Sequence, residues 1–171
     1  MKINNIVGET NGLPQRKKNR LQNYDYSSCG AYFITICTLN RRNYFWNNLE
    51  KNNNLTQNFE LSKYGKIVDT AIQNISLFYP SLTLDSYVIM PNHIHLLLFI
   101  CSDENGRPMV APTISRVINQ LKGTISKQIG VSIWQKSFYD HVIRNNQDYE
   151  KHLQYIYENP MRWQYDELYV E

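Results

Sequence analysis

Two histidines separated by one residue, His93 and His95, are the side chains of this sequence best suited to chemistry. They lie in a run of β-branched, aromatic and aliphatic residues over 86–100, which predicts a buried strand. Alternate residues of a strand point to the same face of a sheet, so the two imidazoles should project side by side. Such a pair either binds one metal ion or fills the core as hydrogen-bonded histidines, and the spacing alone leaves both interpretations open.

A second candidate group lies near the carboxyl end, where residues 146–159 show helical spacing and Pro160 follows. Tyr155 and Asn159 are four residues apart, so they share one face of this helix. The opposite, apolar stripe consists of Tyr149, Leu153 and Ile156. Tyr155 is therefore not needed for docking the helix, and from the residues alone it is either a tyrosine at the edge of that contact or a functional side chain.

Seven elements are needed to position these groups. The patterns predict strands over 31–38, 82–90 and 93–101, an extended segment over 131–143, and helices over 61–79, 113–129 and 146–159. Ser62 is suited to begin the first helix and Gly130 to end the second. This order predicts an α+β fold, a ferredoxin-like antiparallel sheet with helices packed on one face.

The bulk composition fits one globular domain. The chain has 171 residues, of which 42% are hydrophobic and 19% charged, which excludes an intrinsically disordered chain. The formal net charge of +3 is compatible with a polyanionic partner without showing one. The thirteen tyrosines could stack on nucleic-acid bases or simply pack.

Cysteine usage and hydropathy predict a cytoplasmic protein. Cys29, Cys37 and Cys101 are widely spaced, form no Cys-x-x-Cys pair and follow no secretory signal, which is typical of reduced thiols. No segment is long and apolar enough to predict a membrane-spanning helix.

The first 28 residues are polar and lack apolar periodicity, which predicts an N-terminal arm. This arm carries a basic cluster made of Arg16, Lys17, Lys18 and Arg20. The cluster is either a solvated segment or an arm that contacts phosphates. We therefore divide the chain into an arm over 1–28, a single domain over 29–163 and a C-terminal tail over 164–171.

Four short motifs resemble the single-tyrosine HUH transposases, and among them the REP-associated tyrosine transposases. They are Gly-Ala-Tyr-Phe-Ile-Thr at 30–35, His-Ile-His at 93–95 within 90–98, Trp-Gln at 134–135 with Ile-Arg at 143–144, and Tyr-Ile-Tyr-Glu-Asn-Pro at 155–160. Each motif is weak alone, but four in the right order are specific. The resemblance covers about residues 16 to 163.

The resemblance implies an HUH endonuclease fold in which Tyr155 is the nucleophile. It also implies that His93 and His95 bind a divalent metal, Mg²⁺ or Mn²⁺, with Asn159 as a third ligand. The activity implied is cleavage and rejoining of single-stranded DNA beside a hairpin through a 5′-phosphotyrosine intermediate. Tyr157 is a rival nucleophile, but two residues along a helix turn it away from Asn159.

Basic side chains would contact the phosphates of such a substrate. The candidates are Arg16, Lys17, Lys18, Arg20, Arg41, Arg42, Lys122 and Arg144. The resemblance further implies a bacterial protein associated with the nucleoid and no membrane partner. Relatives of this kind include dimers that exchange the tyrosine helix and monomers, so a homodimer and a monomer both stay open.

Two other functions remain as alternatives. A non-catalytic module could bind hairpins or single strands through aromatic residues on a ferredoxin-like sheet. A zinc hydrolase could use His93 and His95, although the sequence has no His-Glu-x-x-His or cysteine-rich pattern to complete such a site.

Overall fold

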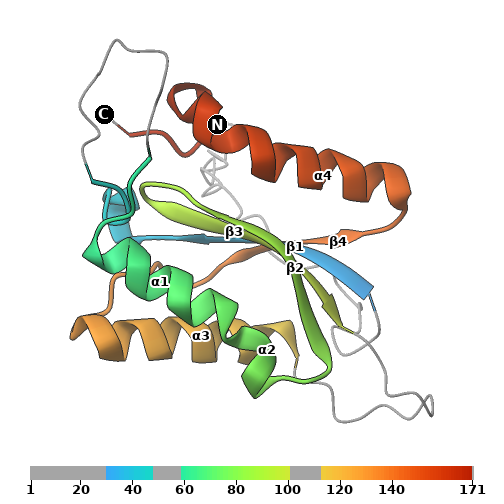
Figure 1. Cartoon of the computed structure of the whole chain (residues 1–171), viewed down its shortest axis with the longest axis horizontal. Helices are drawn as coiled ribbons and strands as arrows, with labels where there is room; N and C mark the ends of the chain where they lie inside the picture. Colours follow the sequence, from blue (N-terminus) through green and yellow to red (C-terminus); the bar gives the residue numbers. More distant parts are fainter. Residues whose placement is uncertain (1–29, 48–58, 101–112, 171) are drawn as a thin grey trace, which may run out of the picture.

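The structure, a computed structural model, describes residues 30–47, 59–100 and 113–170. The N-terminal arm and its basic cluster lie outside the described residues. The described chain forms an α+β fold around one four-stranded sheet (Figure 1). None of the described helices is long and apolar enough to cross a membrane.

The sheet is antiparallel and has the order β2-β3-β1-β4. Its strands are β1 (Gly30–Cys37), β2 (Leu82–Ile89), β3 (His93–Ile100) and β4 (Tyr139–Ile143). The two central strands, β1 and β3, pair along their full length, from Gly30 opposite Ile100 to Cys37 opposite His93. The start of β3 therefore lies beside the end of β1, near one end of the sheet.

The two faces of the central strands differ in what they pack against. On β3, Ile94, Leu96 and Leu98 belong to the larger hydrophobic core, whereas Leu97 belongs to a smaller core on the other face. Because side chains alternate along a strand, His93 and His95 lie on the same face as Leu97. The predicted side-by-side projection of the two histidines is confirmed.

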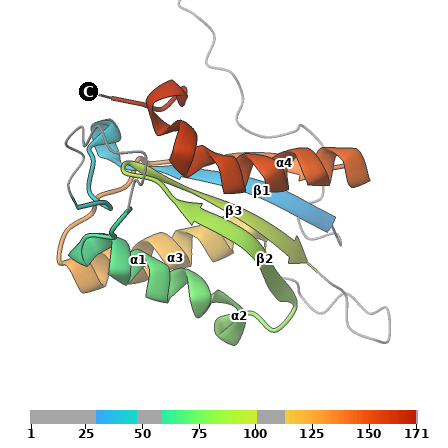
Figure 2. The same ribbon diagram turned by 45° about the horizontal axis from the view of Figure 1, so that its top comes forward.

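Helices cover both faces of the sheet (Figures 1 and 2). One face packs against α1 (Lys63–Gln73), α2 (Ile75–Phe78) and α3 (Ile114–Ile129), while α4 (Asn146–Glu158) lies on the other. The α+β class and the antiparallel sheet are confirmed, but the expectation of helices on one face holds only for α1 to α3. The reason is that β1 and β3 are apolar on both faces, so Phe33 and Leu97 offer a second docking surface that Ile156 of α4 covers.

Local signals set several boundaries as predicted. The Ser62 side chain accepts a hydrogen bond from the Gly65 amide and caps α1. Gly130 ends α3 with φ of 90°, a left-handed conformation that favours glycine. The helix predicted over 61–79 is instead two helices, because Asn74 leaves helical geometry with φ −85° and ψ 0°.

The extended segment predicted over 131–143 is a strand only at Tyr139–Ile143. Before that strand, Trp134 forms an isolated bridge with Thr38. The buried Lys122 ammonium group donates hydrogen bonds to the carbonyl oxygens of Gln135, Lys136 and Ser137. Since these carbonyls are satisfied by a lysine of α3, the segment does not need a partner strand.

Candidate active site

The two histidines meet at the start of β3, under α4. Their side chains are buried, with His93 0% and His95 3% exposed. The two Nε2 atoms are 3.0 Å apart, so both nitrogens point into one small space. A shared space of this kind is what two ligands of one metal ion require.

A hydrogen-bond partner at Nδ1 orients each imidazole ring. The Asn92 amide nitrogen donates to the carbonyl oxygens of Arg41 and Leu168, at 3.2 and 2.8 Å. Its oxygen is thereby turned toward His93 Nδ1, 2.8 Å away. An amide oxygen only accepts, so His93 carries its proton on Nδ1 and presents a lone pair on Nε2. The Thr35 hydroxyl, 2.9 Å from His95 Nδ1, can either donate or accept.

Burial keeps both histidines uncharged. Loss of hydration lowers the pKa of His93 to about 3, with a smaller contribution from the Arg41 charge. Burial also lowers the pKa of His95 well below its ordinary value, and His93 adds to that shift. Neutral imidazoles are the form that binds a metal ion.

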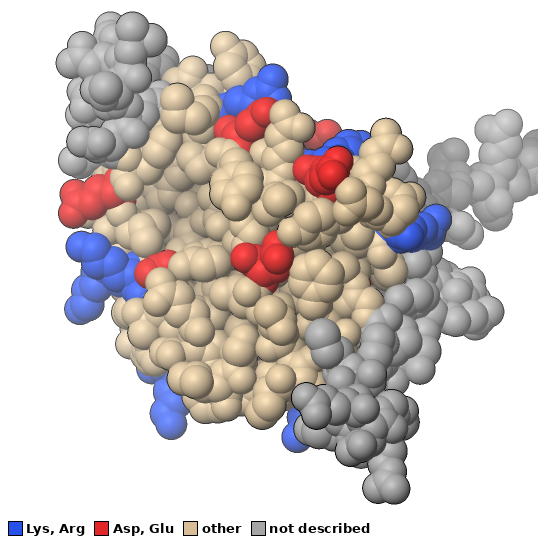
Figure 3. Space-filling model, turned by 45° about the vertical axis from the view of Figure 1, so that its right-hand side comes forward, with Lys and Arg blue, Asp and Glu red and all other residues tan. Residues whose placement is uncertain are grey.

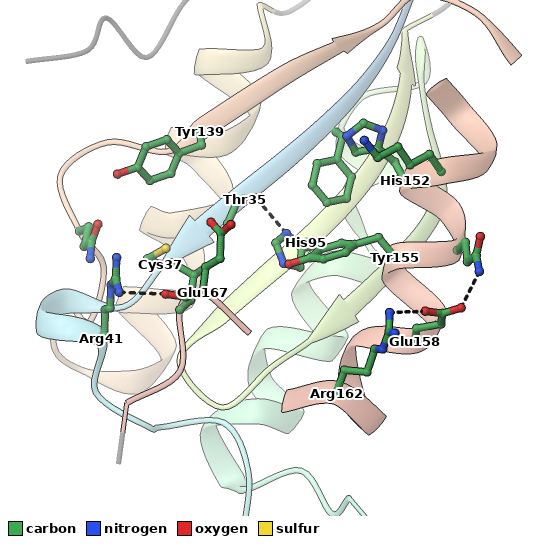
Figure 4. A pocket seen from close by; sticks show the side chains of 15 residues that line it. Thr35, Cys37, Arg41, His95, Tyr139, His152, Tyr155, Glu158, Arg162 and Glu167 are labelled. Carbon is green, nitrogen blue, oxygen red and sulfur yellow. Dashed lines mark hydrogen bonds and ion pairs between the residues drawn. The ribbon is translucent and has the colours of Figure 1, made fainter. Parts of the chain in front are cut away.

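Tyr155 extends from α4 toward His95 (Figure 4). Its ring lies edge-on to the His95 ring, with 5.2 Å between the ring centroids. The residue is 42% exposed and lines a cavity. Partial burial and the Asp166 carboxylate raise the pKa of Tyr155 to about 12.

Asp166 joins the tyrosine to the histidines, and the sequence analysis missed it. Its Oδ2 accepts a hydrogen bond from the Tyr155 hydroxyl at 3.1 Å and lies 4.0 Å from His93 Nε2. The ligand atoms of Asp166, His93 and His95 all lie within 4.8 Å of one another. The Asp166 side chain is 2% exposed, yet among the described residues it pairs with no lysine or arginine. A buried carboxylate without a cation is suited to a metal ion.

Asp166 reaches this place through a short 3₁₀ helix, η2 (Asn159–Tyr165), which follows α4. The segment predicted as a C-terminal tail therefore supplies a site residue. A single aspartate outside any periodic pattern carries no signal for this role in the sequence. Its position depends on where η2 turns the chain.

Asn159 also lies beside the nucleophile candidate. It is 3% exposed and lines a cavity together with Tyr155 and Asp166. Among the described residues its Nδ2 has no hydrogen-bond partner. Tyr157, by contrast, is 69% exposed and belongs to neither of the cavities beside Tyr155.

A cavity of about 750 Å³ opens between β1, α4 and the C-terminal segment (Figure 4). Phe33, Thr35, His95 and Tyr155 lie along it. Its cationic side chains come from Arg41, Lys151 and Arg162. Arg41 donates to the Glu167 carbonyl oxygen at 3.3 Å, and Arg162 pairs with Glu158 at 2.9 Å. The cavity thus brings the Tyr155 hydroxyl together with cationic side chains, an arrangement suited to an anionic ligand.

The structure places the predicted DNA-contacting residues in different environments. Arg41 and Arg42 are exposed beside the end of β1, and Arg144 is exposed at the end of β4. Arg16, Lys17, Lys18 and Arg20 lie outside the described residues. The prediction for Lys122 is wrong. Its ammonium group is buried against three carbonyl oxygens, so it is not free to contact phosphates.

Charged side chains are mixed on the face shown in Figure 3. Acidic groups lie near the middle of that face and also at its left edge, and lysine and arginine lie mostly around its margin. A phosphate backbone would therefore meet discrete cations on this face rather than one continuous basic patch.

Comparisons with known proteins place this chain among related sequences. No protein-family model matches it. An uncharacterized protein of Haemophilus influenzae is 30% identical, over 94% of this chain and 96% of the relative. The REP-associated tyrosine transposase of Escherichia coli is 25% identical, over 80% of this chain and 70% of the relative.

A solved structure has the same fold. It is described as a REP-associated tyrosine transposase bound to a REP hairpin, and it matches with a TM-score of 0.56 and 23% identity. The match covers 84% of this chain and 74% of the other. At the level of the family, the named relatives support a transposase-type enzyme. The chain belongs to one family with the Haemophilus influenzae protein, and it resembles the REP-associated tyrosine transposases as its motifs predicted.

Proposed function

We propose that this protein is a metal-dependent endonuclease and strand transferase that acts on single-stranded DNA beside a hairpin. The observation that carries this proposal is the cluster formed by Tyr155, Asp166 and the histidine pair. Asp166 Oδ2 is 3.1 Å from the phenol oxygen and 4.0 Å from His93 Nε2. A phosphodiester seated there could meet a nucleophile and a metal ion at once.

The ligands proposed for the ion are His93, His95 and Asp166. Two imidazoles and a carboxylate suit a divalent ion such as Mn²⁺, with open positions left for water and phosphate oxygens. Asn159, the third ligand expected from the resemblance, lines the same cavity as Asp166, but its neutral amide is a weaker ligand than a carboxylate. When bound, the ion would polarise a non-bridging oxygen of the scissile phosphate.

The hydrogen-bond partners of the two imidazoles allow both Nε2 atoms to present lone pairs to a metal ion. Without an ion, His93 Nε2 is an acceptor, so His95 Nε2 donates across the 3.0 Å gap and His95 Nδ1 accepts from the Thr35 hydroxyl. To bind an ion, His95 must carry its proton on Nδ1 instead. Thr35 can accept as readily as it donates, so His95 Nδ1 keeps its hydrogen bond in this exchange, and the hydroxyl hydrogen of Thr35 can turn toward the cavity that Thr35 lines.

The proposed reaction starts at the Tyr155 oxygen, which attacks the phosphorus atom. A bond forms between that oxygen and phosphorus, and the bond from phosphorus to the 3′ oxygen breaks. The phenol, oriented by its hydrogen bond to Asp166, loses its proton to solvent in the cavity, and the leaving 3′ oxygen takes up a proton from solvent. A 3′ hydroxyl of another strand can reverse the step, so strands are joined without ATP.

DNA would reach the cavity along its exposed cations. Arg41 lines the cavity itself and Arg42 is exposed next to it in the chain, while Arg144 is exposed at the other end of the sheet, beside the start of β1. The basic cluster of the N-terminal arm, with Arg16, Lys17, Lys18 and Arg20, is proposed as a further phosphate contact. The hairpin named for the structure of the same fold supports a hairpin as the partner of this chain.

The test is a covalent adduct. A labelled single-stranded hairpin DNA is incubated with the protein and Mn²⁺ and resolved on a denaturing gel. We expect a protein–DNA adduct with the native chain and with Tyr157→Phe, and none with Tyr155→Phe. An adduct that persists in Tyr155→Phe would overturn the proposed nucleophile. Hairpin binding by the native chain without any adduct would favour the non-catalytic module.

A further inference from the structure

All four histidines of the chain fall into two pairs, and the second pair is outside the site described above. His141 lies on β4, and His152 lies on α4 together with Asp148. These three side chains meet where the end of β4 approaches the first turns of α4. Two imidazoles sharing one carboxylate form a donor set that proteins use to bind transition metals.

The geometry of this group is compact. His141 Nε2 is 2.9 Å from Asp148 Oδ2, and His152 Nδ1 is 3.2 Å from Asp148 Oδ1. The ligand atoms all lie within 4.8 Å of one another. The two imidazole rings are stacked, with centroids 4.6 Å apart and 21° between their planes. The side chains of Asp148 and His152 are 19% and 18% exposed, so they are held in place while an ion can still enter from solvent.

We propose that His141, Asp148 and His152 form a second metal site for a divalent transition ion such as Zn²⁺, Co²⁺ or Ni²⁺. Ions with ligand bonds of about 2.0–2.2 Å hold tetrahedral ligands about 3.2–3.6 Å apart. The separations of 2.9 and 3.2 Å run to the two different oxygens of Asp148, and all the ligand atoms lie within 4.8 Å of one another, so side-chain rotations can bring one oxygen and both nitrogens to this spacing. Three protein ligands leave one position for water.

The Asp148 carboxylate has the charge and the orientation that an ion requires. Hydrogen bonding from His141 lowers the pKa of Asp148, so this group stays ionised through the neutral range. Its Oδ2 also accepts a hydrogen bond from the Arg144 amide at 3.1 Å, which holds the carboxylate toward the histidines. In the absence of an ion, the carboxylate accepts a hydrogen bond from His141, while His152 Nδ1 donates to the backbone carbonyl oxygen of Asp148 at 2.8 Å. An ion would replace this second hydrogen bond, with the His152 proton then carried on Nε2.

The proposed ion would act on the position of Tyr155 through Phe33. The Phe33 ring lies between the two histidine pairs, with its centroid 5.0 Å from His95 and 4.6 Å from His152. It also contacts Tyr155, at 6.0 Å between centroids. An ion bound at the second site would fix His152, and with it the turn of α4 that precedes Tyr155.

The test counts metal ions per chain. Protein without an affinity tag is stripped with a chelator and dialysed against Co²⁺, and bound cobalt is measured by elemental analysis and visible absorption. We expect one equivalent to be lost in His141→Gln and in His152→Gln, with a second equivalent lost separately in His93→Gln. Circular dichroism checks that each variant is folded. Unchanged cobalt content in both His141→Gln and His152→Gln would overturn the proposal.

A second measurement uses the native chain alone, so it does not depend on any variant folding. Because the chain has four histidines, their imidazole ¹⁵N resonances can be resolved during a Zn²⁺ titration. We expect the resonances of His141 and His152 to shift and saturate at a stoichiometric amount of Zn²⁺. Shifts confined to His93 and His95 would overturn the second site, whatever the outcome for DNA cleavage.

Discussion

Among the proposed metal ligands, Asp166 offers the clearest test by mutation. Replacing Asp166 with asparagine keeps the shape of the side chain but removes the buried negative charge next to the histidine pair. We expect Mn²⁺ affinity to fall by at least about 10-fold, since losing even an outer partner of a metal site has an effect of that size. Isothermal titration calorimetry measures it.

Glu167→Gln is the matched control, because it removes the same charge from the adjacent, exposed residue. Mn²⁺ affinity should be unchanged in this variant. Equal losses in Asp166→Asn and Glu167→Gln would mean that only the general negative charge of the segment matters.

The buried histidines also predict how stability depends on pH in metal-free protein. The pKa of His93 is lowered to about 3, so the folded chain keeps this imidazole neutral while the unfolded chain takes up a proton below pH about 6.5. The unfolded state then binds more protons, so the free energy of unfolding falls as the pH decreases from 7.5 to 5.5. The slope is at most about 1.4 kcal/mol per pH unit for each such histidine.

Urea unfolding in the presence of a chelator measures this dependence. In His93→Gln the contribution of one buried imidazole is absent, and the slope between pH 7.5 and 5.5 should become smaller. An identical slope in His93→Gln and the native chain would show that His93 is already protonated in the folded state.

At the scale of elements, α3 carries a lysine that holds the segment leading into β4. Lys122→Met retains the aliphatic part of the side chain but leaves the carbonyl oxygens of Gln135, Lys136 and Ser137 without their donor. Buried polar groups without a partner are destabilising, so we expect a loss of about 1–3 kcal/mol in the free energy of unfolding. Lys127→Met, on an exposed position of the same helix, should change stability little.

Denaturant midpoints of the two variants provide the comparison. If Lys122→Met and Lys127→Met were equally stable, the contacts to the three carbonyls would be energetically unimportant. DNA affinity of a folded Lys122→Met protein should match that of the native chain, since this ammonium group is not available to phosphates.

At the scale of the whole molecule, the helices on the two faces of the sheet differ in how many residues they bury. Of the thirteen described residues of α4 only Ile156 is buried, whereas α3 buries six of sixteen. Regions with little buried apolar surface open at lower free energy than the core. We therefore expect the amides of α4 to exchange with deuterium earlier than those of α3 and β3 in metal-free protein.

Hydrogen exchange followed by mass spectrometry tests this order. Added Mn²⁺ should slow exchange in the segment around Asp166, since an ion held there would join the C-terminal segment to β3. Exchange of α4 and β3 at a common rate would mean that the molecule opens as one cooperative unit.

The sequence by itself determined those features that depend on neighbours within a few residues. Alternation along 93–100 put His93 and His95 on one face, and Ser62 and Gly130 marked helix ends through their own hydrogen bonding and backbone freedom. The same local rules put Tyr155 and Asn159 on one side of the last helix. Periodicity and capping act over one or two turns, so they can be recognised without the fold.

Only the tertiary structure decided which distant groups meet. Asp166 reaches the histidines because η2 turns the chain back, and Lys122 is buried because its ammonium group bonds carbonyl oxygens of the segment before β4. The side chosen by α4 depended on β1 and β3 being apolar on both faces, which leaves two docking surfaces that the sequence cannot rank. These outcomes depend on packing between segments far apart in the chain, and no local pattern records that packing.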